Sequence, residues 1–195
     1  MKPGAVKLAM ATAAVVVVLG ALGAARLADR SPTVTVTGEA SPELREVVAV
    51  AWGEFIGFFA SRSSCIADVR VERAWELDDR ARYSPPEHLI RLRVPGSAAQ
   101  LEESLLHELA HHLELTCPDH QELRSAFLDA QGFAADVDWF DAPRWEDRPS
   151  EHFAETVVER LAGGDRYHRL TIDVTPGAVA IVEQWAEGSL HPSSP

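Results

Sequence analysis

Two histidines and a glutamate stand together in the run HELAH at residues 107–111. On a helix that turns about 100° per residue, His107 and His111 lie about 40° apart, so both imidazoles can reach one metal ion. Glu108 lies about 100° round the helix, where it can hold a water beside the ion and act as general base. The leucines of this segment fall on the opposite face, which the protein core can bury. The pattern predicts a zinc centre rather than two unrelated surface histidines.

A catalytic zinc needs a third protein ligand and one open position. The segment PSEHFAETVVERL, a predicted helix, places Glu151 and Glu155 about 40° apart on one face, with its apolar residues on the other. Glu151 can be the third ligand, and Glu155 can accept the free ring N–H of His107. The sequence leaves open which of the two carboxylates binds the ion. His120 or Asp119 are alternative ligands, and a solvated acidic helix face is the competing interpretation.

The two motifs together, HELAH and E-x-x-x-E on a later helix, resemble the gluzincin branch of the zincin metallopeptidases. The run EHFAE at 151–155 is similar to the E-F-F-A-E run of lethal-factor-like peptidase domains. This resemblance covers roughly residues 87–163. It implies that His107, His111 and Glu151 are the zinc ligands. It also implies that Glu108 is the general base and that Glu155 supports His107 from outside the ligand set.

The resemblance also implies that the strand expected at 87–94 forms the sheet edge beside the cleft, where an extended peptide could add as a further strand.

The chain departs from two sequence patterns of zinc peptidases. Glu114 and Cys117 stand where the extended HExxHxxGxxH motif has Gly and His, so that form is excluded. Arg144 stands seven residues before Glu151, where lethal-factor-like domains have Tyr. The candidates for an oxyanion stabiliser, each competing with a structural role, are Arg144, Tyr167 and His168.

Periodicity and turn residues predict the elements that must position these groups. Residues 31–38 are expected to form a strand or a linker, and two further strands are expected at 68–77 and 87–94. Five helices are expected at 42–61, 97–115, 120–131, 149–163 and 175–188. The aromatic loop 132–148 either lines a substrate pocket or, as we favour, forms a hydrophobic plug with Trp139, Phe140 and Trp145. This order predicts an α+β, zincin-like fold. Its small mixed sheet packs with the HExxH helix and several further helices in a single domain, 31–195.

The N-terminal 30 residues indicate export. Lys2 and Lys7 precede an uncharged apolar run from Leu8 to Ala25, which is typical of a signal peptide or of a retained membrane anchor. Both interpretations place the folded domain outside the cytoplasm, either secreted or tethered to the outer face of the membrane. In an exported chain, Cys65 and Cys117 are expected to form a disulfide, which would fix the end of the HELAH helix.

The formal net charge of -12 argues against nucleic-acid binding and against association with an anionic membrane surface, except through the N-terminal segment. We therefore predict a zinc metallopeptidase that acts on a peptide or protein substrate. Two alternatives stay open. One is a zincin-shaped binding domain without catalysis, in which a fourth ligand such as His120 closes the site. The other is a zinc amidase acting on a non-peptide cell-envelope substrate. The sequence carries no signal for the oligomeric state.

Overall fold

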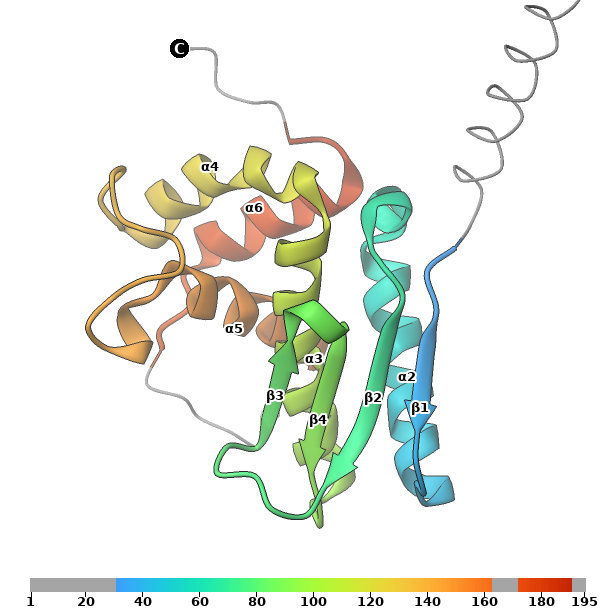
Figure 1. Ribbon diagram of the computed structural model, residues 1–195. Coiled ribbons are helices and arrows are strands. Elements are labelled where there is room, and N and C mark those ends of the chain that lie inside the picture. The colour runs from blue at the N-terminus through green and yellow to red at the C-terminus, as the bar shows by residue number, and fades with distance from the viewer. Residues whose placement is uncertain (1–30, 163–171, 191–195) are drawn as a thin grey trace, which may run out of the picture. The chain divides into compact units, whose positions relative to one another are not determined.

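A computed structural model of the chain describes residues 31–162 and 172–190, in which four short strands form one mixed sheet (Figure 1). The strand order is β1-β2-β4-β3, in which β1, β2 and β4 run parallel and β3 pairs with β4 in the antiparallel direction. The strands are β1 Val34–Thr37, β2 Val69–Ala74, β3 Ala81–Ser84 and β4 Leu89–Arg93.

Five α-helices accompany the sheet, namely α2 Pro42–Phe58, α3 Ala98–Thr116, α4 Gln121–Gln131, α5 Pro149–Ala162 and α6 Pro176–Glu187. Three of them begin at an N-cap whose hydroxyl accepts a backbone N–H of the first turn, at Ser41, Ser97 and Thr175. At α3 the side chain of Gln100 bonds back to the Ser97 amide and completes a capping box. Helix α4 ends at Gly132, whose φ of 85° would strain any residue with a Cβ.

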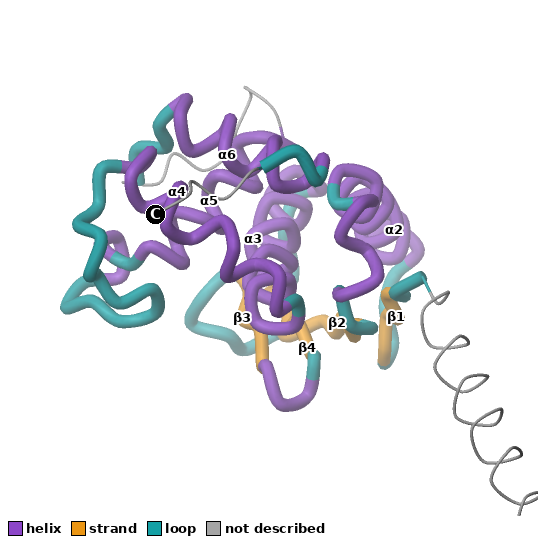
Figure 2. Tube along the Cα trace, turned by 90° about the horizontal axis from the view of Figure 1, so that it is seen from above, coloured by secondary structure: helices purple, strands orange, loops and turns teal. Residues whose placement is uncertain are grey.

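Helices α2 and α3 pack together and cover one face of the sheet, as the view from above shows (Figure 2). α2 lies against β1, whereas α3 lies against β3 and β4. α5 packs along α3, and α4 and α6 complete the helical part. α3 is therefore the central element, because it contacts the sheet on one side and a second long helix on another.

The apolar face of α3 is anchored in the core. Leu105, Leu106, Leu109 and Leu113 have no exposed surface, in agreement with the helical pattern of the sequence. Truncating one of them to alanine would cost about 2–5 kcal/mol. α5 buries Phe153 and Val157 in the same core. Because the apolar faces of α3 and α5 are both buried in the core, the orientation of the two helices is fixed. Their polar faces are fixed with it.

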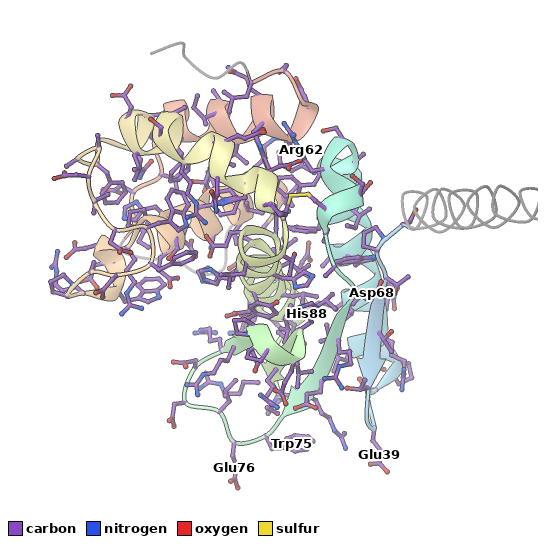
Figure 3. All side chains as sticks on the ribbon, turned by 45° about the horizontal axis from the view of Figure 1, so that its top comes forward. Glu39, Arg62, Asp68, Trp75, Glu76 and His88 are labelled. Carbon is purple, nitrogen blue, oxygen red and sulfur yellow. A yellow bond between two sulfur atoms is a disulfide. The ribbon has the colours of Figure 1, made fainter. Side chains whose placement is uncertain are left out.

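The two cysteines are paired as expected. Cys65 and Cys117 bring their Cα atoms to 4.7 Å and join the turn after α2 to the end of α3, near Arg62 (Figure 3). Arg62 fastens the same region to α6, since its Nε donates to the carbonyl oxygen of Trp185 at 3.0 Å. The C-terminal end of the HELAH helix is thus held by a covalent link and by a neighbouring hydrogen bond.

The α+β class, the small mixed sheet and the helices agree with the prediction, but one strand was missed. β3, at Ala81–Ser84, forms the edge of the sheet next to α3, and β4 lies inside the sheet. The expectation that the strand at 87–94 forms the edge is therefore wrong. The expected leader, 1–30, lies outside the described residues. Among the helices that are described, none is long and apolar enough to cross a membrane.

Candidate metal centre

Three side-chain atoms from two helices converge on one point. Nε2 of His107 and Nε2 of His111 lie 3.1 Å apart. Oε2 of Glu151, from α5, lies 3.1 Å from the first nitrogen and 3.3 Å from the second. Among the described residues, these three side chains form a group whose donor atoms all lie within 4.8 Å of one another. The spacing on α3 and the first turn of α5 thus produce the predicted cluster.

The outer nitrogen of each imidazole faces a carboxylate. Nδ1 of His107 lies 2.8 Å from Oε1 of Glu155, and Nδ1 of His111 lies 2.6 Å from Oε1 of Glu114. Because ionised carboxylates only accept, each Nδ1 must carry the proton that is shared. This arrangement turns the lone pair of each neutral ring, at Nε2, toward Glu151. Glu114 and Glu155 are both almost fully buried, with side chains 1% and 2% exposed.

The carboxylates around the cluster raise the pKa of both histidines. Burial opposes protonation of His107, but its hydrogen bonds to Glu151 and Glu155 outweigh burial and raise its pKa to about 9. The pKa of His111 is also raised, because bonds to Glu114 and Glu151 outweigh burial. Burial alone would raise the pKa of Glu151, yet the two histidines hold it well below its usual range. The site favours positive charge at its centre.

A zinc ion fits this donor set. Ligands about 2.0–2.1 Å from a tetrahedral centre are separated by about 3.3 Å, close to the 3.1–3.3 Å found among the three atoms. Two neutral Nε2 atoms and a carboxylate oxygen are the nitrogen and oxygen donors that zinc takes in catalytic sites. Two protonated rings would instead place two positive charges 3.1 Å apart. The chemistry of the cluster therefore suits a divalent cation better than protons.

Glu108 borders the same cleft and is held by the edge strand. Its Oε2 accepts the backbone N–H of Tyr83, on β3, at 2.8 Å. The side chain is largely buried but lines the open space beside the two histidines. The Glu108 carboxylate thus lies outside the group of three converging donor atoms and is held by a backbone donor.

The ring of Tyr83 takes part in a second contact with α3. Nε2 of His112 donates to the carbonyl oxygen of Ala67 at 2.9 Å, so its Nδ1 accepts the Tyr83 hydroxyl at 2.8 Å. Burial lowers the pKa of His112 to about 4 and raises that of Tyr83 to about 12, so both groups stay neutral near pH 7. The first residue pair fastens α3 to the segment before β2, and the second fastens α3 to β3.

The cluster opens into a cleft of about 670 Å³. The turn that precedes α5 contributes Trp145, whose ring lies nearly parallel to that of His107, with centroids 6.3 Å apart. It also contributes Arg148 to the lining. The edge strand β3 and the segment before it contribute further residues, including Tyr83 and Arg82. The three converging side chains therefore lie on the wall of an open cleft.

Several alternative site residues are not brought to this cleft. The side chain of Arg144 is 66% exposed, forms a bidentate ion pair with Asp147 and is not among the residues that line the cleft. His120 is buried among aromatic rings, and Asp119 pairs with Arg62 at 3.7 Å. Tyr167 and His168, the two other oxyanion candidates, lie outside the described residues.

The aromatic loop divides between the two predicted roles. Trp139 is buried, 6% exposed, in contact with Phe127 and Phe153, as a hydrophobic plug would be. Trp145 instead lines the cleft, and Phe140 is 43% exposed. The loop therefore both closes part of the core and forms one wall of the site.

Sequence reasoning missed Glu114, Tyr83 and Arg148. Glu114 follows His111 by three residues, a spacing that places both side chains on one helix face and could have identified it. Tyr83 lies on the strand that was not predicted, and nothing in the local sequence distinguishes Arg148 from other surface arginines. Comparison with protein families, with curated proteins and with solved structures finds no match to this chain.

Proposed function

We propose that this protein is a zinc-dependent metallohydrolase, and specifically a metallopeptidase of the zincin type. One observation carries the proposal, namely the convergence of His107, His111 and Glu151 on a point bordered by Glu108. The support comes from donor chemistry and spacing, and from the resemblance of the two motifs to gluzincins. Export of the domain, as a secreted or membrane-tethered protein, belongs to the same proposal.

His107, His111 and Glu151 would hold the ion, while Glu155 and Glu114 would keep the two rings in the tautomer that binds metal. When bound, zinc would polarise a substrate carbonyl and make water acidic enough to attack it near neutral pH. Glu108 would take the proton from the attacking water and later return it to the leaving amine. The amide of Tyr83 would keep that carboxylate in place during both transfers.

The cleft supports catalysis rather than a purely structural metal site. A structural zinc is closed by four protein ligands, whereas the described cluster contains three. His120, the example of a fourth ligand that would favour the binding-domain alternative, has its Nε2 buried without a polar partner among the described residues and its ring packed on Phe153. The cluster also faces a space large enough for a peptide segment.

The Glu108→Gln variant tests this mechanism. The expected result is one zinc per chain, as in the parent, with kcat on a broad peptide library reduced about 10²- to 10⁴-fold. Glu102→Gln, a change of the same kind on the same helix, serves as the matched control and should keep parental kcat. Undiminished hydrolysis by zinc-loaded Glu108→Gln protein would overturn the proposed mechanism.

A further inference from the structure

Arg148 differs from Arg82 and Arg93, two other arginines that line the cleft. Its Nε is buried and has no hydrogen-bond partner among the described residues. Arg82 pairs with Asp79 at 2.5 Å, and Arg93 donates to the carbonyl oxygens of Leu77 and Asp78. Arg148 lines the cleft without a comparable acceptor. A permanently charged fork therefore stands beside the metal ligands with unused donors.

The backbone of Arg148 is fixed on both sides. Its N–H donates to the carbonyl oxygen of Trp145 at 3.1 Å, and its own carbonyl accepts the amides of Glu151 and His152 at 3.1 and 3.2 Å. The last of these bonds belongs to the start of the helix that supplies the third metal ligand. The backbone of Arg148 is thus tied to the same turn as Glu151, which keeps the base of its side chain close to the proposed third metal ligand.

A buried guanidinium N–H without an acceptor is unfavourable, since the group has lost water and gained nothing in return. The acceptor that matches the planar fork best is a carboxylate, which takes two parallel hydrogen bonds. The acidic residues nearest in sequence do not meet this need, because Asp147 is engaged by Arg144 and Glu151 by the two histidines. A carboxylate of a ligand that enters the cleft could supply this acceptor.

We propose that Arg148 binds a carboxylate of the substrate, so that the cleft selects peptides carrying an acidic side chain or a free C-terminus close to the scissile bond. This inference rests on the proposed function and adds a substrate class to it. The carboxylate would anchor the peptide on the part of the cleft lined by Trp145 and Arg148. Both sources supply the same group, and the experiment distinguishes them.

The experiment measures peptide binding separately from hydrolysis. Zinc-loaded Glu108→Gln protein is titrated with fluorescein-labelled octapeptides that carry Glu or Gln at one position at a time, all amidated. A second series compares one alanine-rich octapeptide as free acid and as amide. Anisotropy should show that one carboxylate peptide binds about 10- to 100-fold more tightly than its neutral partner. The series in which this occurs identifies the side chain or the C-terminus as the source.

Adding Arg148→Gln should reduce that preference to less than about twofold, and Arg148→Lys should leave an intermediate value, because an ammonium lacks the fork. Arg82→Gln is the matched control, a cleft arginine that already has a partner, and should keep the full preference. Zinc content and melting temperature equal to those of the parent would show that the fold of each variant is intact. If Arg148→Gln does not fold, the binding preference is measured on Arg148→Lys alone.

Equal binding of charged and neutral peptides by the parent, or a preference that survives in both Arg148 variants, would overturn the inference. In that case, hydrolysis of the same peptides by the wild-type protein would leave the peptidase function standing. A protein that neither binds nor hydrolyses any peptide would overturn both.

Discussion

Glu114 joins Trp139 to His111. One carboxylate oxygen accepts the indole N–H of Trp139 at 2.7 Å, and the other lies 2.6 Å from Nδ1 of His111. The buried tryptophan of the 132–148 loop and a proposed metal ligand therefore share one acidic group. The loop and α3 depend on each other for their geometry through this carboxylate.

Replacing Glu114 by Gln should weaken zinc binding about 10- to 100-fold, because an amide has only one accepting oxygen for two donors. Competition with a chromophoric chelator measures the affinity. Trp139→Phe should leave His111 with its acceptor and cause a smaller loss. Glu102→Gln, also on α3, is the control and should bind zinc like the parent. Equal affinities for Glu114→Gln and the control would contradict the positioning role.

Removing zinc should destabilise the fold, because the ion binds only when α3 and α5 face each other. At free zinc about a thousandfold above Kd, the expected stabilisation is about 4 kcal/mol. Thermal unfolding with zinc and with a chelator gives the measurement. In His111→Ala protein the two curves should coincide, and a zinc-dependent shift that persists there would show that the ion binds elsewhere.

The Cys65–Cys117 pair closes a segment with a sequence separation of 52 residues. The double variant Cys65→Ser/Cys117→Ser should lower the free energy of unfolding by about 4 kcal/mol, since its unfolded chain is less constrained. Denaturant titration measures the loss. Treating the parent with reductant should give a similar decrease, whereas the double variant should not respond to reductant. Identical unfolding curves for oxidised parent and double variant would exclude a stabilising disulfide.

Trp145 should report on the metal directly, because its ring lies against that of His107. Cobalt(II) bound in place of zinc should quench tryptophan fluorescence, and Trp145→Phe should remove the larger part of this quenching. Trp75→Phe is the matched control, since Trp75 is 64% exposed and lies at the far end of the sheet from Arg62 (Figure 3). Quenching that is unchanged in Trp145→Phe but lost in Trp75→Phe would place the metal elsewhere.

The sequence predicted those parts of the site that depend on local periodicity. His107, Glu108 and His111 share a helix, and so do Glu151 and Glu155, so helical geometry alone sets their relative directions. That the two helices meet follows from their apolar faces, which can be recognised in the sequence but not paired from it. The sequence therefore predicted which residues could form the site. The contact between α3 and α5, which brings those residues together, comes from tertiary packing.

Two differences between prediction and structure have physical causes, namely the strand β3 that was not predicted and the choice of Arg144 rather than Arg148 as a residue of the site. β3 is only four residues long and includes Arg82, so its own sequence carries almost no strand signal. It forms a strand because β4 offers an antiparallel partner. Arg144 was selected by its distance along the chain from Glu151. The intervening 3-10 turn, Trp145–Asp147, instead directs Arg144 to solvent and places Arg148 in the cleft.

The bond between the Tyr83 amide and Glu108 makes the position of the proposed general base depend on how β3 pairs with β4. Residues inserted before Ala81 would lengthen the rim of the cleft and leave that bond in place. A shift of one residue in the pairing of β3 with β4 would instead turn every β3 side chain to the opposite face. The 75–80 segment can therefore vary in length, while the register of β3 against β4 must be kept.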